Sequence, residues 1–267
     1  MKKPIGIFDS GVGGLTVYRA IRNAFPEEDL VYFGDTARVP YGPKSPNTII
    51  EYSVQNARFL LQQGIKTLIV ACNTSSSVAI PHLRALTDIP IIGVIDPGSE
   101  VAVRSSQSGR IGVIGTEGTI RSGAYSKAIT LRNPQAEVFT KPCPLFVPIV
   151  EEGWQDHSIA RQVVEEYLGS MKDLSIDTLV LGCTHYPLLS HVIQSYMGDS
   201  VKLVDSADAI TLHLSSLLPP EHDGKPGNDS FYVSDNEDKF ASIASRILNN
   251  PMKNLKRVRL FESWFID

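Results

Sequence analysis

Two cysteines in matching sequence contexts carry the main chemical signal of this chain. Cys72 follows the apolar residues 69–71, Cys183 follows residues 180–182, and hydroxyl or amide side chains come after each cysteine. Short apolar runs that lead into helix-capping residues are typical of buried parallel strands followed by helices. The pattern therefore places each cysteine at the carboxyl end of a strand, where open α/β sheets bind their ligands.

A thiol at a helix N-terminus has a physical reason to ionise. Unpaired backbone amides and the helix dipole favour the thiolate over an unperturbed pKa of about 8.5. The alternative is that Cys72 and Cys183 are small buried side chains, as most cysteines of cytosolic enzymes are. Their matched contexts favour the chemical interpretation. Cys143 lies between two prolines, lacks this context and is interpreted as structural.

The two cysteines belong to a longer internal repeat. Matching segments recur in the same order at residues 5–10 and 111–116, 31–33 and 138–139, the two cysteines, and 93–96 and 202–205. Four strand signals repeated in order indicate two similar α/β units, each with a cysteine at the end of its third strand. If the units face each other, both thiols border one cleft.

The repeat predicts an α/β fold of two similar doubly wound domains related by pseudo-two-fold symmetry, with the active site in the cleft between them. A chain of 267 residues also exceeds the usual size of a single core. The second unit is complete without the elements expected near residues 207–218, 231–233, 237–248 and 257–261, which follow its four repeated segments. We therefore predict an inserted second domain at 98–207, carrying Cys183, and a first domain formed by 1–97 and 208–267, carrying Cys72.

Composition excludes several classes of function. The net charge is −4, so no basic surface argues for nucleic acid. Three cysteines without a spaced framework argue against a disulfide scaffold and for a reducing compartment. Neither a signal-peptide pattern nor an apolar segment of membrane-spanning length is present in the sequence. We expect a cytoplasmic protein that binds neither nucleic acid nor membrane.

Asp9 ends the first predicted strand and precedes a glycine-rich turn at residues 11–14. Backbone amides of such a turn can approach an anion closely. The turn does not complete a dinucleotide fingerprint, because Thr16 stands where the third glycine belongs, and no P-loop lysine follows. We therefore expect no nucleotide cofactor. Asp9 either caps the next helix or, beside a thiol, shuttles a proton or binds an ammonium group.

Other polar residues at strand ends are candidates for ligand contact. The loop at residues 34–43 contains Tyr41 and Gly42, and the tyrosine either contacts a ligand or plugs the loop onto the core. The amide and hydroxyls at residues 73–77 exceed the needs of one helix cap and suit a carboxylate. The turn at residues 115–119 is a second anion-binding candidate.

His185 is the histidine with the clearest chemical context. A Cys-x-His step is too tight for the usual zinc pattern and has no partner pair, so we expect no metal. His185 either supports Cys183 as a proton partner near neutral pH or is a hydrogen-bonded core histidine. Glu151 or Glu152, after a strand-like segment at 146–150, is a candidate hydrogen-bond partner for it.

Two facing thiols without metal or nucleotide suit proton transfer at a carbon next to a carboxylate. Removing a proton from one face of a planar carbanion and supplying one to the other face needs two acid/base groups. A thiolate and a thiol have closely matched proton affinities, so the pair can work in both directions. The sequence therefore predicts a cofactor-independent racemase or epimerase.

The motifs reached so far resemble those of the glutamate racemases in the aspartate/glutamate racemase family. The resemblance covers nearly the whole chain and rests on the segments at residues 6–15, 35–42, 71–74 and 181–187. It implies interconversion of L- and D-glutamate, supply of D-glutamate for bacterial peptidoglycan, and a homodimer. It implies no cofactor.

The resemblance also implies roles for individual residues. The two bases would be Cys72 and Cys183, and the residues that assist proton movement would be Asp9, Glu151 and His185. Substrate contacts would come from Asp9, Ser10, Tyr41, Gly42, Asn73, Thr74, Thr184 and His185, with Thr116 and Thr119 as further carboxylate contacts.

Three rival functions stay open at the level of sequence. Aspartate racemase shares the two-thiol logic and would differ in the depth of the cleft. A two-lobed amino-acid binding module would bind without catalysis. A thiol oxidoreductase would need cysteines close enough to form a disulfide.

Overall fold

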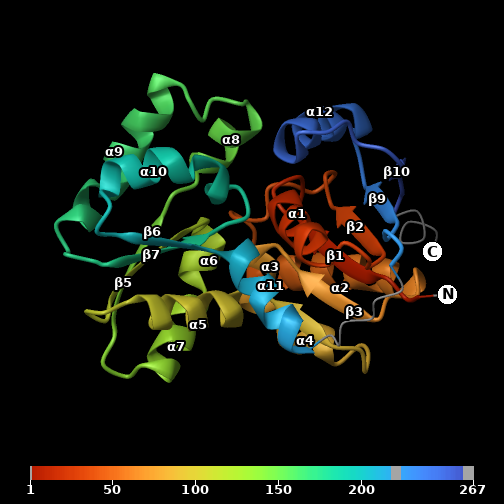
Figure 1. Cartoon of the computed structure of the whole chain (residues 1–267), viewed down its shortest axis with the longest axis horizontal. Helices are drawn as coiled ribbons and strands as arrows, with labels where there is room; N and C mark the ends of the chain where they lie inside the picture. The colour runs from red at the N-terminus through yellow and green to blue at the C-terminus, as the bar shows by residue number, and fades with distance from the viewer. Residues whose placement is uncertain (1, 218–223, 261–267) are drawn as a thin grey trace.

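The computed structural model describes residues 2–217 and 224–260, which form two lobes side by side (Figure 1). Each lobe is built on one sheet of parallel strands. The first sheet contains β1 (Ile5–Asp9), β2 (Leu30–Gly34), β3 (Thr67–Val70), β4 (Ile91–Gly93), β9 (Asp229–Val233) and β10 (Leu255–Arg257). The second contains β5 (Arg110–Gly115), β6 (Glu137–Pro142), β7 (Thr178–Gly182) and β8 (Lys202–Asp205).

The order of the strands confirms the internal repeat and the predicted fold class. The first sheet runs β10-β9-β2-β1-β3-β4 and the second runs β6-β5-β7-β8. The arrangement β2-β1-β3-β4 therefore recurs as β6-β5-β7-β8, with Cys72 just beyond β3 and Cys183 directly after β7. In both lobes the third strand of the repeat lies between the first and the fourth, so each cysteine follows an interior strand of its sheet.

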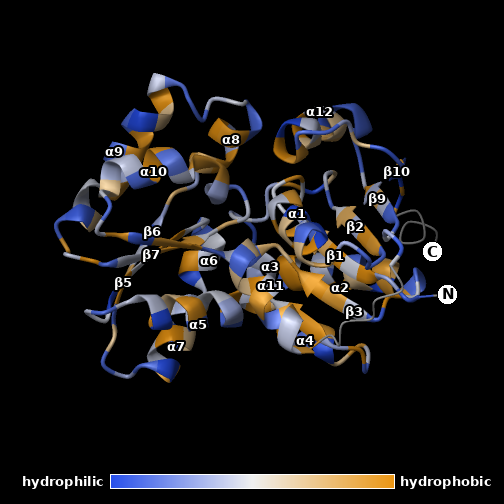
Figure 2. Cartoon of the chain, viewed as in Figure 1, coloured by the Kyte–Doolittle hydropathy of each residue, from blue (hydrophilic) through white to orange (hydrophobic). Residues whose placement is uncertain are grey.

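Helices cover both faces of each sheet, as buried parallel strands require. The first lobe has α1 (Leu15–Ala24), α2 (Pro46–Gln62), α3 (Asn73–Val78), α4 (Ile80–Arg84), α11 (Ser206–Leu217) and α12 (Glu237–Leu248). The second has α5 (Ile95–Ser105), α6 (Glu117–Arg121), α7 (Ala124–Arg132), α8 (Phe146–Glu151), α9 (Ser158–Lys172), the 3₁₀-helix η1 (Tyr186–Leu189) and α10 (Ser190–Met197). Figure 2 shows apolar strands between helices of mixed hydropathy.

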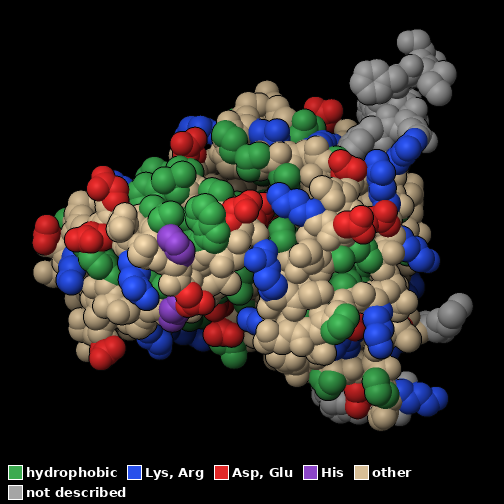
Figure 3. Space-filling view, turned by 90° about the horizontal axis from the view of Figure 1, so that it is seen from above, with side chains coloured by type: hydrophobic (Ala, Val, Ile, Leu, Met, Phe, Trp, Pro, Cys, Tyr) green, Lys and Arg blue, Asp and Glu red, His purple; other side chains and the backbone are tan. Residues whose placement is uncertain are grey.

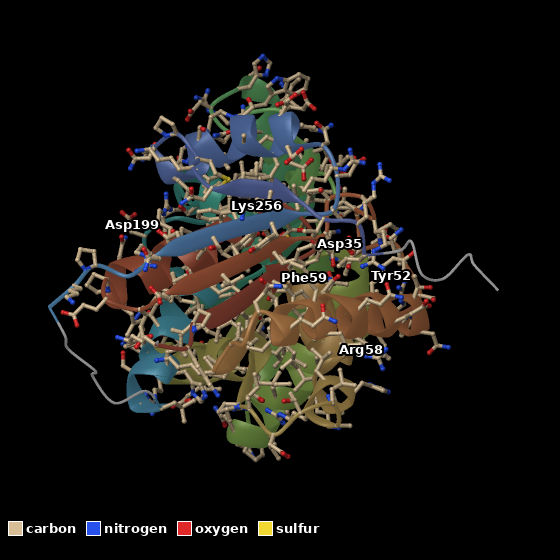
Figure 4. The ribbon with its side chains drawn as sticks, turned by 90° about the vertical axis from the view of Figure 1, so that its right-hand side faces the viewer. Asp35, Tyr52, Arg58, Phe59, Asp199 and Lys256 are labelled. Atoms are coloured by element: carbon tan, nitrogen blue, oxygen red, sulfur yellow. The ribbon has the colours of Figure 1, made fainter. Side chains whose placement is uncertain are left out.

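Each helical layer buries an apolar face against its sheet. In the first lobe, α1, α11 and α12 pack on one face of the sheet, and α2 and α4 pack on the other. On the second face Phe59 of α2 meets Phe33 of β2 at 5.1 Å and Tyr232 of β9 at 5.2 Å between ring centroids (Figure 4). In the second lobe α5 and α7 cover one face, while α8, α9 and α10 cover the other.

The chain passes between the lobes through two helices that pack against each other. It leaves the first lobe through α5, which follows β4, and returns through α11, which follows β8. The proposed domain boundaries at 97/98 and 207/208 would lie within these helices. β4 stops at Gly93 and α5 starts at Ile95, so the repeated segment at 93–96 spans the end of a strand and the start of a helix. Pro97 is tolerated there because the first turn of a helix leaves its N–H groups unpaired anyway.

The strand-like interpretation of residues 146–150 is wrong, because these residues form α8. Phe146, Ile149 and Val150 are buried at helical spacing, and a short continuous apolar run does not distinguish helix from strand by periodicity. The element expected near residues 257–261 overlaps only the end of strand β10, which stops at Arg257. Residue 218, the last of the element expected at 207–218, and residue 261 lie outside the described part of the chain. Within the two described ranges, no helix combines the length and apolarity needed to cross a bilayer.

Candidate active site

Cys72 is the N-cap of α3, just beyond the carboxyl end of β3. Its Sγ accepts a hydrogen bond from the Ser75 backbone N–H at 3.5 Å and lies 3.7 Å from Ser10 Oγ. The expectation that a helix N-terminus ionises this thiol is wrong. Burial, together with the charge of Asp9, raises the pKa of Cys72 to about 11 and outweighs these hydrogen bonds. Cys72 is therefore a thiol at neutral pH.

Cys183 follows β7 but precedes a turn and η1 instead of an α-helix. Its Sγ lies 3.9 Å from Nδ1 of His185, and the Cys183 side chain is buried. The second thiol thus has an imidazole as its neighbour where the first has a helix N-terminus.

His185 links Cys183 to Glu151. Its Nε2 lies 3.2 Å from Glu151 Oε1, so the hydrogen bond suggested between a glutamate and this histidine is present. Burial lowers the pKa of His185, but the interactions with Cys183 and Glu151 outweigh burial and raise it to about 10. The hydrogen bond to His185 also lowers the pKa of Glu151. The imidazole is therefore a cation at neutral pH, held between a sulfur and a carboxylate.

Asp9 is fully buried at the end of β1 and joins the two lobes. It accepts hydrogen bonds from the Gly11 N–H at 3.0 Å and from the Thr184 hydroxyl at 3.3 Å. Burial raises the pKa of this carboxyl, although the nearby His185 opposes the shift. The Thr184 carbonyl in turn accepts a hydrogen bond from Thr16 Oγ1 at 3.0 Å. The carboxyl group of Asp9 is thus a titratable group directly behind Thr184.

Both cysteines line one cavity between the lobes. The predicted site residues that line it with them are Ser10, Tyr41, Gly42, Asn73, Thr74, Thr116, Glu151, Thr184 and His185. Asp9 and Thr119 lie behind the lining and contact it through Thr184, Thr74 and Thr116. Gly11, from the glycine-rich turn that was expected to approach an anion, also lines the cavity. The sequence interpretation missed three lining residues without polar side chains: Val39, Pro40 and Val147. Of these, Val147 lies on α8, which had been interpreted as a strand.

The cavity is small and opens into a larger apolar vestibule. Its volume is about 40 Å³, enough for a few water molecules. The vestibule outside it has a volume of about 400 Å³ and shares Val39, Pro40 and Val147 with the inner cavity. A bound amino acid would therefore need more room than the inner cavity alone offers. Seen from above, hydrophobic side chains gather on the second lobe (Figure 3).

Three threonine hydroxyls meet at the boundary of the lobes. Thr74 Oγ1, from the first lobe, lies 2.8 Å from Thr116 Oγ1 and 3.3 Å from Thr119 Oγ1, both of which belong to the second. Thr116 also accepts a hydrogen bond from the Thr119 N–H at 3.2 Å. Such a group of hydroxyls can donate to a carboxylate.

The Tyr41 hydroxyl is engaged inside the first lobe. It donates to Asp35 and accepts from Asn56 Nδ2 at 3.1 Å. Arg38 donates to the same aspartate at 2.6 Å and lies 4.0 Å from the centre of the Tyr52 ring; Asp35 and Tyr52 are labelled in Figure 4. Tyr41 therefore anchors the loop at residues 34–43 to the core of the first lobe and also lines the cavity.

Cys143 does not line the cavity, and its side chain is fully buried. Burial raises the pKa of its thiol, and its carbonyl accepts a hydrogen bond from the Tyr186 hydroxyl at 2.7 Å. All three cysteines are free, with no disulfide between them. Among the residues with described positions, no group of three or more His, Cys, Asp or Glu side chains could hold a metal ion.

Comparison with known proteins gives consistent matches. The family described as Asp/Glu/Hydantoin racemase matches residues 5–214. The glutamate racemase of Geobacter metallireducens is 51% identical over 264 residues, which cover 97% of each chain. A glutamate racemase isoform from Bacillus anthracis is 37% identical, with a TM-score of 0.93 over 97% of this chain and 98% of that chain. The glutamate racemase of Francisella tularensis, solved in complex with D-glutamate, is 40% identical, with a TM-score of 0.91 over 98% of this chain and 99% of that chain.

Proposed function

The chain belongs to the Asp/Glu/hydantoin racemase family, and we propose that it interconverts L- and D-glutamate by a two-base mechanism without a cofactor. One observation carries the proposal: Cys72 and Cys183 come from opposite lobes and line one cavity. The names of the relatives support glutamate as the substrate.

Racemisation breaks one bond between the α-carbon and hydrogen and forms another on the opposite face. The thiolate of one cysteine takes the α-proton and leaves a carbanion next to the substrate carboxylate. The thiol of the other cysteine gives its proton to the opposite face. The two cysteines exchange protonation states, no other atom is gained or lost, and the reverse reaction restores the starting state.

Each of the two cysteines has a titratable neighbour of its own. Burial and Asp9 raise the pKa of Cys72 and keep it protonated. The His185 imidazolium, held by Glu151, can stabilise negative charge on the sulfur of Cys183. Asp9, behind Thr184, is the corresponding titratable group near Cys72. These partners allow protons to be redistributed between turnovers.

We assign the substrate carboxylates to the polar lining of the cavity. The hydroxyls of Ser10, Thr74 and Thr116 can donate to them, and Thr119 supports this group from behind. Thr184 lines the same cavity, with its hydroxyl donating to Asp9. Asn73 Nδ2 is buried without a hydrogen-bond partner, so a carboxylate oxygen there would satisfy it. Tyr41 and Gly42 form the adjoining wall.

The cellular role we propose is the supply of D-glutamate for peptidoglycan synthesis by a cytoplasmic homodimer. The similarity to glutamate racemases supports this role, and the free cysteines are consistent with a reducing compartment. Rescue of a D-glutamate auxotroph tests the role, and analytical ultracentrifugation tests the dimer. A monomer at cellular concentration would contradict the proposed assembly.

Isotope exchange tests the two-base mechanism. In deuterated water each enantiomer should acquire deuterium at the α-carbon as it converts, measured by NMR and by circular dichroism. Product that keeps its original hydrogen would contradict the mechanism. L-aspartate should be assayed alongside L-glutamate, because preferential turnover of aspartate would change the substrate assignment.

Alanine variants test each thiol. Cys72→Ala and Cys183→Ala should each lower kcat by at least about 10³-fold while the protein stays folded and binds glutamate. Normal racemisation by either variant removes that cysteine from the mechanism. A wild-type protein that binds glutamate without converting it would favour the binding-module alternative.

A further inference from the structure

Tyr125 is a buried residue near the start of α7, and its ring lies against Gly182, the residue before Cys183. A Cβ added to Gly182, the last residue of β7, would lie 3.1 Å from Tyr125 Cε2. A Cβ added to Gly98 would lie 3.3 Å from Cε1 of the same ring. The ring therefore fits between two glycine backbones, one of which is adjacent to Cys183.

The Tyr125 hydroxyl reaches the segment that carries the other cysteine. It donates a hydrogen bond of 2.7 Å to Oδ1 of Asn73, the residue after Cys72. The Ser206 hydroxyl, at the start of α11, donates to the same oxygen at 3.3 Å. One side chain of the second lobe thus contacts both cysteine-bearing segments.

These two donors fix the orientation of the Asn73 amide. Because Oδ1 accepts both hydroxyls, the amide nitrogen Nδ2 is directed elsewhere, and it is buried without a partner. Asn73 lines the cavity. A buried N–H donor without a partner beside a cavity is a place where a ligand acceptor binds favourably.

We propose that Tyr125 is a positioning residue that orients the Asn73 amide toward the substrate carboxylate and ties this orientation to the contact between the lobes. The inference rests on the proposed racemisation. Burial raises the pKa of Tyr125, so its hydroxyl stays protonated and remains a donor over the working pH range.

The first test is Tyr125→Phe, which keeps the ring and removes the donor. The freed amide should raise KM for glutamate by about tenfold and change kcat by less than about threefold. This is the pattern expected when an interaction equally strong in the ground state and the transition state is lost. Ser206→Ala should raise KM by a smaller factor, because its bond is longer. Ser206→Ala also tests the proposal if Tyr125→Phe does not fold.

The matched control is Tyr18→Phe. Tyr18 is a buried tyrosine of α1 in the core of the first lobe, and its hydroxyl bonds to Asp229. This variant should lose stability and keep the wild-type KM. Wild-type KM in folded Tyr125→Phe would overturn the proposal.

A double-mutant cycle separates positioning from general destabilisation. If Tyr125 acts through Asn73, the double variant Tyr125→Phe/Asn73→Ala should have the same KM as Asn73→Ala alone. If the two substitutions raise KM by independent factors that multiply in the double variant, the proposal is overturned.

NMR of the Asn73 side-chain NH₂ group gives a readout without turnover. The signals should be sharp in the wild type and exchange-broadened in Tyr125→Phe, and sharp signals in both would refute the orientation. If the wild type fails to racemise glutamate, the proposed function fails, while this measurement still decides whether Tyr125 orients the amide.

Discussion

Replacing Glu151 with glutamine tests the proton partner of Cys183 most directly. Glutamine keeps the size of the side chain and an acceptor oxygen for His185 Nε2 but removes the negative charge. In the wild type the pKa of His185 is raised to about 10, so the imidazolium persists well above neutral pH. Glu151→Gln should therefore lose this cation at a lower pH.

The distance sets the size of the effect. Two unit charges 3.2 Å apart attract by about 1.3 kcal/mol at the dielectric constant of water and by about 5 kcal/mol at an effective value near 20. The side chains of Glu151 and His185 are 23% and 7% exposed, so the attraction exceeds its value in water. Because about 1.4 kcal/mol corresponds to one pH unit, the alkaline limb of kcat should move down by at least one pH unit.

The assay is kcat for both directions from about pH 6 to 11, followed by circular dichroism. The matched control is Glu152→Gln, which removes the same charge from the exposed neighbouring residue and should leave the profile unchanged. An alkaline limb at the wild-type position in Glu151→Gln would refute the assignment of the Glu151–His185 pair to the mechanism.

The same substitution predicts a change in the pH dependence of stability. His185 has a folded-state pKa raised from 6.5 to about 10, so its contribution is complete below pH 6.5 and is lost as the pH rises through about 10. In Glu151→Gln this fall in the free energy of unfolding should be smaller. Urea unfolding at both ends of the range measures it.

Three further substitutions test the contacts that build the site. Gly13→Ala should lower kcat by about 10²-fold with the fold retained by circular dichroism, because the added Cβ would lie 2.5 Å from Thr184 Oγ1 and closer still to Nδ1 of His185. Arg246→Met should raise KM about threefold in steady-state kinetics, because Arg246 of α12 donates to the Glu151 carbonyl of α8 at 2.6 Å and holds the lobes together there. Cys143→Ala should keep wild-type kcat and lose about 1 kcal/mol in urea unfolding, because this thiol only fills the core.

Each of these predictions has a clear contrary result. Gly169→Ala, on α9, adds a Cβ at ordinary contact distance from the Tyr196 hydroxyl and should leave kcat unchanged. Equal effects of the Gly13 and Gly169 substitutions would show that close packing at Gly13 is unimportant. An unchanged KM in Arg246→Met would show that the contact between Arg246 and the Glu151 carbonyl does not affect substrate binding. A folded but inactive Cys143→Ala variant would place the third thiol in the mechanism.

The sequence alone determined the elements that repeat. The apolar runs before Cys72 and Cys183 identified the third strand of each unit, because buried parallel strands need side chains that are apolar on both faces. The recurrence of four such segments predicted two similar sheets, and the structure confirms the shared strand order. Local pattern was sufficient here because the identity of each strand depends on residues close together in the chain.

Tertiary structure decided the electrostatics and the contacts across the cavity. A helix N-terminus beside Cys72 predicted a thiolate, yet burial beside Asp9 raises its pKa, and the extent of burial is set by the whole fold. Tyr125 carried no sequence signal because its partners, Gly182 and Asn73, lie far from it in the chain. Such contacts form only when the two lobes pack together, so residue type and spacing could name the two thiols but could not show what holds their surroundings in place.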